Sequence, residues 1–556
     1  MKKRPLIFAC ALLMAASAGS QSIYDAVNVT QKDLNGTARF VGMGGAMGAL
    51  GGDISTIGTN PAGIGIFRSN DVMTSFGYFI TGTESDYAGV KFENDKARWS
   101  FDNIGAVIST KIGNVTPLRY VNFGFNYHKT KSFYKNMTMS GLMGSVQMAD
   151  GNWTPVSQVR YMAQQATDMG FYGNELASDE IYHNIDAGWL GIMGYQGWLT
   201  DAGGNGNIFY PYVPSEADAY FHSQERGGID QYDLNVAFNI NDRFYLGFTV
   251  GLYDVDYSKY TFYDERYSSQ GTDGTAYQEG YSLETFKSIH GSGFDVKLGA
   301  IIRPFEYSPL RIGLAVHTPI FYSLTYTTGA LLTPDIYLTD DNTGEEFLPD
   351  VVDTYSILGG RDMDRDFNLQ TPWLVNASLG YTVGNALALG AEYEYENYSA
   401  MKFKYPDGGG EMSTETNEAK NNLKAVHTLR LGAEYRPISA FAMRAGYNYS
   451  TAVYEEGALK YLPTNALDTD TDFTNSQSMN TVTLGIGYRW SSFYMDLAYK
   501  FLTYKADFYP FFNEMSENAA NDYIITGNES AFLVTPEATT VKNTRSQVLL
   551  TLGFRF

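Results

Sequence analysis

Three groups of residues in this chain have types that could do chemistry: alternating aspartates, scattered histidines and a glycine-rich run. The aspartates, at positions 468, 470 and 472, begin like a calcium loop, in which alternate carboxylates ligate the ion. Phe473 stands where that loop needs its turn glycine, and Met479 where it needs its bidentate acid. We therefore interpret Asp468–Asp472 as a solvated loop and predict no metal site.

No other pattern predicts catalysis. The six histidines never form an H-x-x-x-H pair, and the sequence has no G-x-S-x-G elbow for a serine hydrolase. Carboxylates are abundant, but their spacing singles out no catalytic pair. The sequence thus predicts a protein that is not an enzyme and needs no cofactor.

The glycine-rich run, Gly42–Phe67, looks at first like a dinucleotide-binding loop. The third glycine of G-x-G-x-x-G would fall at Met47, and no βαβ unit surrounds the run, so we exclude that function. Gly44, Gly48 and Gly52 recur every four residues, which on a helix would give a smooth packing face. Asn60-Pro61 favours a turn or extended chain.

The composition indicates what must position this run. The 556 residues include 43 Tyr, 34 Phe and 57 Gly, and only 18% are charged. Such enrichment without long apolar stretches is typical of a membrane β-barrel and predicts no transmembrane helix. The net charge of −22, about −25 once a basic leader is removed, argues against nucleic acid as a partner.

The N-terminus has the pattern of a secretory signal peptide. Lys2, Lys3 and Arg4 precede an apolar stretch, and Ala16-Ser17-Ala18 fits a cleavage site. We predict a signal peptide over residues 1–18, with cleavage as late as residue 20 as the alternative. Cys10, the only cysteine, lies inside it, so the mature chain is expected to have no disulfide.

Fourteen segments alternate apolar and polar residues, and short turns alternate with long loops between them. The clearest pair is Ile229–Ile240 and Phe244–Tyr257, joined by Asn241-Asp242-Arg243. This order predicts an all-β, transmembrane antiparallel barrel in a bacterial outer membrane, with short turns in the periplasm. The last strand ends at Phe554 and Phe556, which we interpret as a signal for the barrel-insertion machinery.

The predicted barrel covers residues 71–556, and its longest extracellular loop covers residues 131–228. Residues 19–70 precede the first strand and are expected in the lumen as a hatch, or plug, because an open barrel of this size would conduct water. The hatch residues are Gly42, Met43, Gly44, Gly45, Ala46, Asn60, Pro61 and Ala62.

These hatch residues resemble the N-terminal signature of the FadL/TodX family of outer-membrane transporters for long-chain fatty acids and other hydrophobic compounds. The resemblance rests on the Gly42–Ala46 run and on Asn60-Pro61-Ala62-Gly63, just ahead of the first strand. It implies a fourteen-stranded barrel that takes up a hydrophobic ligand by loop capture, hatch movement and lateral release. The family breaks its wall at the third strand, which here contains Gly124 but no proline.

The stretch Ala187–Leu199 carries apolar side chains in a loop that should lie outside the cell. Its candidate residues for hydrophobic ligand capture are Trp189, Leu190, Ile192, Met193 and Trp198. The alternative is that they pack the loop on itself or over the barrel mouth. Lys129, Arg160 and Arg226 are candidates to pair with an acidic head group.

The leading hypothesis is uptake of hydrophobic compounds such as long-chain fatty acids or aromatics. The expected partners are that ligand, outer-membrane lipids and the insertion machinery, with the barrel acting as a monomer. The alternative is a plugged barrel that serves as a structural or docking component for secretion or surface assembly. A diffusive porin is disfavoured by the plug.

Overall fold

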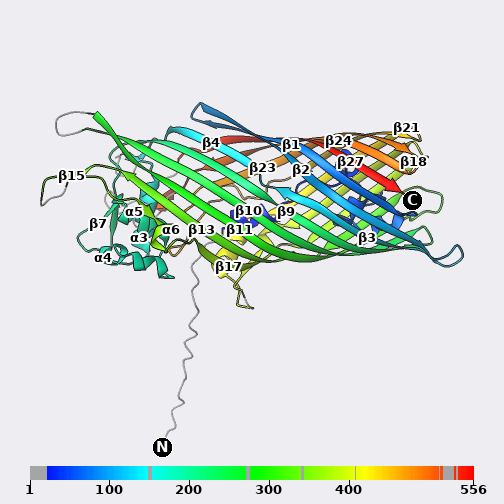
Figure 1. Ribbon diagram of the computed structural model, residues 1–556, viewed down its shortest axis with the longest axis horizontal. Coiled ribbons are helices and arrows are strands. Elements are labelled where there is room, and N and C mark those ends of the chain that lie inside the picture. Colours follow the sequence, from blue (N-terminus) through cyan, green and yellow to red (C-terminus); the bar gives the residue numbers. More distant parts are fainter. Residues whose placement is uncertain are drawn as a thin grey trace, which may run out of the picture.

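A computed structural model describes residues 22–147, 153–270, 276–339, 343–406, 408–512, 514–516, 531–533 and 536–556, which form a closed antiparallel β-barrel (Figure 1). The predicted signal peptide, residues 1–18, lies outside the described residues. β1 pairs with β27 from Asp71↔Arg555 to Asp86↔Thr540, which closes the sheet. The predicted count of 14 wall strands is confirmed.

Several wall positions consist of two collinear strands. In chain order the wall is β1 (Asp71–Tyr87), β2 (Val90–Lys111), β3 with β4 (Leu118–Ser132, Lys135–Leu142), β9 (Ala217–Ile240), β10 (Phe244–Gln270), β11 (Ala276–Ile302), β12 with β13 (Arg311–His317, Phe321–Asp335), β17 with β18 (Met363–Gln370, Leu374–Val383), β19 (Leu387–Asn397), β21 (Ala425–Ile438), β22 (Phe441–Ser450), β23 (Phe473–Trp490), β24 (Phe493–Tyr509) and β27 (Thr539–Arg555).

The strands alternate as a membrane barrel requires. On β10, Phe244, Leu246 and Phe248 are exposed on the outer face, whereas Tyr245 and Thr249 are buried inside. An apolar outer belt of this kind faces lipid tails. At the loop end of β10 and β11 the belt gives way to an exposed ion pair, Asp256 with His290 at 3.4 Å. No described helix has the length and apolar character needed to cross a membrane.

The wall extends beyond the belt at the loop end. β10 and β11 each have 27 residues, whereas about ten suffice to cross the apolar layer. The wall also continues through β4 to Leu142 and resumes at Ala217. The observed loop is therefore shorter than the predicted one, residues 131–228. Outside the bilayer both faces of a strand meet water or protein, and the alternation that marks a strand in the sequence fades.

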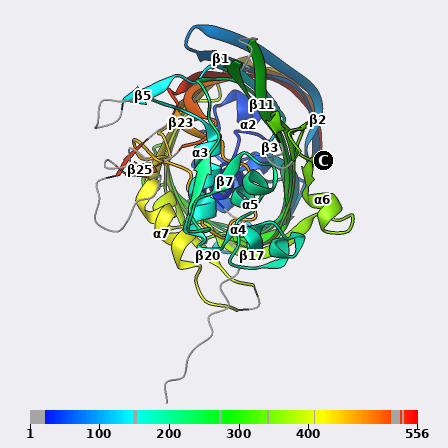
Figure 2. The same ribbon diagram turned by 90° about the vertical axis from the view of Figure 1, so that its left-hand side faces the viewer.

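The segment between β4 and β9 folds into a cap across the loop end (Figure 2). Its elements are β5 (Ser145–Gln147), β6 (Trp153–Pro155), α3 (Gln158–Asp168), α4 (Gly173–Leu176), η3 (Asp179–His183), α5 (Trp189–Gln196), β7 (Thr200–Ala202) and β8 (Phe209–Pro211). The remaining short elements are β14 (Leu338–Thr339), β15 (Glu346–Phe347), β16 (Val352–Asp353), α6 (Thr354–Ile357), η4 (Tyr398–Ala400), β20 (Lys402–Lys404), α7 (Ser413–Asn422), β25 (Glu514–Ser516) and β26 (Ala531–Leu533).

The N-terminal segment, residues 22–70, lies inside the barrel, where Figure 2 shows α2 within the ring of strands. It contains α1 (Ile23–Thr30), α2 (Ala38–Gly42), η1 (Ile54–Gly58) and η2 (Pro61–Ile66). Helix α2 packs against β22, β23, β24 and β27, whereas η2 packs against β3, β9, β10 and β11. The segment therefore touches the wall on opposite sides of the lumen.

Candidate functional site

The glycine run fits the inner wall through backbone conformations that other residues rarely adopt. Gly44, Gly45, Gly51 and Gly52 have φ of +62°, +78°, +60° and +70°. A Cβ on Gly44 would lie 2.9 Å from the Tyr447 nitrogen, so the segment touches the wall backbone directly. Gly44, Gly48 and Gly52 do not share a helical face, because α2 ends at Gly42 and left-handed turns follow.

The wall strands that contact this run also carry glycines at the contact positions. Gly380, Gly390, Gly432 and Gly446 stand side by side in register on β18, β19, β21 and β22. A Cβ on Gly390 would lie 2.0 Å from the Ala46 oxygen, and one on Gly432 would lie 2.3 Å from the Met43 oxygen. Sequence reasoning missed this row, since a single glycine in a strand does not reveal its neighbours across the sheet.

Asn60-Pro61-Ala62 rests on a second glycine pair, Gly247 and Gly299, which face each other on β10 and β11. A Cβ at either position would lie within 2.2 Å of Asn60 or Pro61. The Asn60 side chain accepts a hydrogen bond from the Ala62 nitrogen at 3.1 Å and donates one to the Ala300 carbonyl at 3.3 Å. The motif thus caps η2 and joins it to the wall.

Helix α1 fills the lumen on the loop side of these contacts. Ser22 caps the helix, accepting a hydrogen bond from the Asp25 nitrogen at 3.2 Å. Its apolar residues Ile23, Val27 and Val29 are buried in a cluster that includes the inward tyrosines of β10 and β13. The apolar part of the upper lumen is therefore occupied by the chain itself.

The wall has a seam between β2 and β3. Their pairing starts at Lys111↔Tyr120 and stops at Asn103↔His128. Farther toward the loop end, β2 pairs with β1 alone, while β3 and β4 pair with β9. Tyr78 and Trp99, with rings 4.9 Å apart, lie just past this point on the outer face. Such aromatic residues mark the membrane interface, so the seam begins at that level.

The N-terminal segment bridges the seam from inside. The Asn35 amide donates to the Asp102 carboxylate on β2 at 2.8 Å and to the Lys129 carbonyl on β3 at 2.9 Å. The Asp33 nitrogen donates to the Thr130 carbonyl at 2.8 Å. Polar groups of the β3 edge that would otherwise pair with β2 are thereby partly satisfied.

The Asp33 carboxylate adds two contacts at the same place. It accepts a hydrogen bond from the Ser132 nitrogen at 3.2 Å and forms an ion pair with Arg545 of β27 at 2.7 Å. Residues 33–35 thus connect β2, β3 and β27. The family resemblance implies a wall break at the third strand, but the sequence gives no sign of the residues that close it.

A cavity of about 170 Å³ lies beside this bridge, between the N-terminal segment and the wall. Its lining mixes apolar residues such as Leu34, Phe40 and Leu374 with many charged ones. Three lysines line it: Lys32, Lys131 and Lys500. None of them forms an ion pair with another residue in the described part of the chain, and Lys500 donates to the Leu34 carbonyl at 2.6 Å. The lining therefore places ammonium groups and apolar side chains close together, along with the carboxylates of Asp33, Glu394 and Glu396.

The predicted capture residues do not form an open surface. Trp189, Leu190, Ile192 and Met193 are fully buried in the core of the cap, and Trp198 alone is exposed, at 56%. Helix α5 packs against α3, and a Cβ on Gly197 would meet Leu332 of β13. The structure thus matches the alternative, in which this stretch packs over the barrel mouth.

The three candidate head-group partners lie apart. Lys129 forms an ion pair with Asp230 at 2.8 Å on the wall. Arg160 is buried in the cap and donates to the Pro155 carbonyl at 2.7 Å. Arg226 is exposed and donates to the Gln224 side chain at 3.0 Å. They do not converge on one site.

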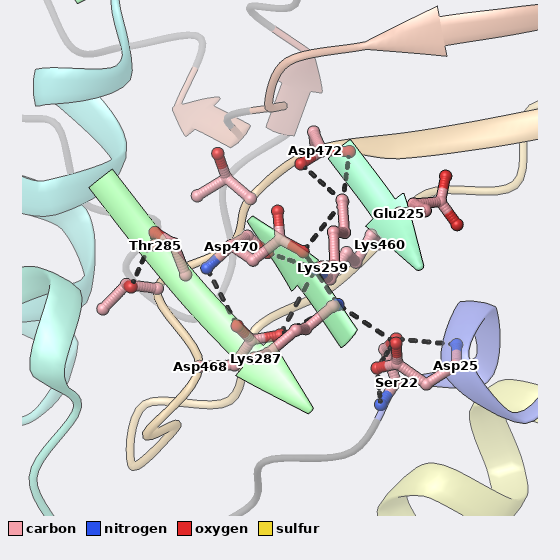
Figure 3. Close-up of polar contacts among 12 residues, drawn as sticks. Ser22, Asp25, Glu225, Lys259, Thr285, Lys287, Lys460, Asp468, Asp470 and Asp472 are labelled. Atoms are coloured by element: carbon pink, nitrogen blue, oxygen red, sulfur yellow. Dashed lines mark hydrogen bonds and ion pairs between the residues drawn. The ribbon is translucent and has the colours of Figure 1, made fainter. Parts of the chain in front are cut away.

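The prediction of a solvated loop at Asp468–Asp472 is wrong. Asp468, Asp470 and Asp472 are at most 8% exposed and point toward lysines of the wall and of their own loop (Figure 3). Lys259 lies 2.7 Å from Asp472, and Lys460 lies 3.4 Å from Asp468. Their wall partners, Lys259 and Lys287, lie far away in the sequence, so the run alone could not reveal this pairing.

Lys287 joins this acidic loop to helix α1. Its ammonium lies 2.7 Å from Asp470 and 3.0 Å from Asp25 (Figure 3). Burial lowers the pKa of Lys287, but Asp25 and Asp470 outweigh burial and hold this pKa well above its ordinary value. Burial raises the pKa of Asp470, and Lys259 and Lys287 more than offset it, so that this pKa lies well below its ordinary value.

The C-terminal aromatics lie on the outer face at the turn end. Phe554 and Phe556 are exposed, with rings 5.8 Å apart. Phe556 also exchanges backbone hydrogen bonds with Asn70, at 3.0 and 3.1 Å, just before β1. Their role in insertion stays a prediction.

No family model and no curated protein matches this sequence. Among solved structures it is similar to a Pseudomonas aeruginosa FadL homologue, with 14% identity, a TM-score of 0.47 and coverage of 94% of this chain and 99% of that chain. The P. putida toluene transporter TodX (10%, TM-score 0.45) and the Ralstonia pickettii toluene transporter TbuX (12%, TM-score 0.42) have the same coverage. At such identities the likeness is one of fold.

Proposed function

We propose that this protein is an outer-membrane barrel that takes up a small amphipathic compound and releases it sideways into the membrane. The observation that carries the proposal is the seam between β2 and β3, which residues Asp33 and Asn35 of the N-terminal segment close from inside. In this proposal the N-terminal segment is a hatch, and its movement opens the seam.

The physical reason is the cost of leaving strand edges unpaired. Backbone groups without partners are unfavourable near the bilayer, so the seam stays shut while Asp33 and Asn35 occupy it. The cavity of about 170 Å³ shares these two residues in its lining, so one displacement would open the cavity and the seam together. Because the seam begins at the membrane interface, an apolar body that leaves at its membrane-proximal end enters lipid rather than water.

The cavity favours a carboxylic acid with an apolar body, such as a long-chain fatty acid, over an unsubstituted aromatic. Lys32, Lys131 and Lys500 would attract the carboxylate, and Leu34, Phe40 and Leu374 would contact the chain. A plain hydrocarbon would have to desolvate these ammonium groups without compensating them.

A disulfide across the seam tests the route. The Asn35→Cys/Asp102→Cys pair replaces two side chains that are in hydrogen-bond contact at 2.8 Å. We expect the oxidised protein in proteoliposomes to stop passing a fluorescent fatty acid, and a reductant to restore passage. The single-cysteine variants under the same oxidation are the control. Equal uptake by the oxidised and reduced pair would refute the lateral route.

One observation favours the second candidate, a plugged barrel that serves as a docking component. The cap is closed over the mouth, with Trp189, Leu190 and Ile192 fully buried. If wild-type proteoliposomes neither bind nor pass fatty acids, whatever the redox state of the cysteine pair, the docking role replaces transport.

A further inference from the structure

A second cavity, of about 640 Å³, lies at the turn end beneath the N-terminal segment. Its roof includes Leu50, Ile66 and Phe67 of that segment, and its rim includes the β18–β19 turn around Asn385. Short turns face the periplasm in barrels of this kind, so this cavity opens to the periplasm. We refer to it as the vestibule.

Five arginines and a single carboxylate, Glu434, line the vestibule. The arginines are Arg39, Arg68, Arg311, Arg436 and Arg555. The chain as a whole carries a net charge of −22, with 61 acidic and 39 basic residues. The vestibule therefore has the opposite balance to the rest of the molecule, which a random distribution of charge over the surface does not explain.

The partners of these arginines leave many donors unused. Arg39 and Arg436 share Glu434, at 3.0 and 2.7 Å, and Arg444 contacts the same carboxylate at 2.7 Å. Arg311 donates to the Leu50 carbonyl at 2.6 Å and forms no ion pair with any residue that the structure describes. Each guanidinium has five N–H donors, so several remain for a ligand.

Arg68 and Arg555 hold the two sides of the vestibule. Arg68 forms an ion pair with Asp242 at 2.6 Å, and Arg555 forms one with Asp71 at 2.6 Å. Arg311, Arg436 and Arg555 lie on three separate strands, β12, β21 and β27, and Arg68 lies on the N-terminal segment. Such a spread suits several carboxylates along a chain better than one small ion, because each fork binds one carboxylate.

We propose that the vestibule binds an acidic peptide segment of a periplasmic protein. Carboxylates of that segment would pair with the arginines, and apolar side chains beside them would contact Ile66 and Phe67 in the roof. Lipid head groups lie outside the ring of strands, whereas this cavity lies within it. Because Arg39 and the roof belong to the N-terminal segment, the partner would touch the hatch directly.

The test uses the full-length protein in a neutral detergent and a short fluorescent peptide of alternating Asp and Phe. We expect binding that weakens with added salt and is absent for the same peptide with Asn in place of Asp. Arg311→Gln/Arg436→Gln should weaken binding about tenfold or more. Arg226→Gln/Arg361→Gln removes the same charge at the loop end and should leave binding unchanged.

A second variant guards against misfolding. Arg68→Gln removes an ion pair with Asp242, which keeps its hydrogen bond from Asn239, and a contact with the Tyr120 ring. It should also weaken binding while barrel stability stays unchanged. Equal affinity in all variants would overturn the proposal. Inorganic phosphate that competes as well as the peptide would instead indicate a small-anion site, and binding only when anionic lipid is added would indicate a head-group site; either result also overturns it.

Discussion

At the residue scale, the contact between the N-terminal segment and the wall depends on missing side chains. Gly44 approaches the wall with its backbone, and Gly390, Gly432 and Gly446 receive the carbonyls and amide of Met43–Ala46. Hydrogen on the Cα is the only substituent that fits such distances. The two glycine sets are thus complementary, although they are several hundred residues apart in the sequence.

Replacing one wall glycine should disturb this contact. In Gly390→Ala the new methyl would meet the Ala46 oxygen at 2.0 Å, so we expect destabilisation by about 1–3 kcal/mol from overpacking. Protease sensitivity of the N-terminal segment and the thermal midpoint of the barrel measure the effect.

Gly204→Ala is the matched control, because a Cβ at Gly204 has no heavy atom within 4 Å. If Gly390→Ala and Gly204→Ala have the same protease sensitivity and thermal midpoint, the N-terminal segment does not pack on the wall glycines as described.

At the element scale, the sequence predicts the strands, but it does not predict which side chains from distant elements meet inside the barrel. The period-2 pattern of Phe244, Leu246 and Phe248 follows from lipid on one face and lumen on the other, so it appears in the sequence. The burial of Asp470 depends on Lys259 and Lys287, which lie on other elements. The bridge by Asn35 likewise arises only once β2 and β3 separate.

The cap gives the next prediction, since two tryptophans of one stretch have opposite environments. Trp189→Ala should destabilise the cap by about 3–5 kcal/mol, because it leaves a cavity in a fully buried core. Trp198→Ala should cost less than about 1 kcal/mol, because that side chain is 56% exposed and contacts Phe347 at its edge. The rate of proteolytic cleavage within the cap compares the two.

A faster cleavage of the Trp198 variant than of the Trp189 variant would contradict the observed packing. Loss of fatty-acid binding in Trp198→Ala with an intact cap would restore a capture role for this stretch.

At the scale of the whole molecule, closure depends on the last strand. β27 pairs with both β24 and β1, and Phe556 is tied to Asn70. Phe556→Ala should lower the folded fraction in outer membranes several-fold if the terminal aromatic is the insertion signal. Heat-dependent gel mobility measures that fraction.

Phe305→Ala is the control for this variant, since Phe305 is similarly exposed, at 61% against 63% for Phe556, but lies in a turn. If both variants assemble to the same extent, Phe556 is not the insertion signal.

The enclosure of the N-terminal segment also couples its placement to the closure of the barrel. Residues 22–70 touch strands from β2 to β27 and lead directly into β1, which is the partner of β27. Once β1 and β27 have paired, the sheet has no free edge, so the folded N-terminal segment can no longer enter the lumen through the wall. Residues 22–70 must therefore either lie inside before the last strand seals the cylinder or enter later, unfolded, through an open end, so closing the ring and placing this segment are linked steps of assembly.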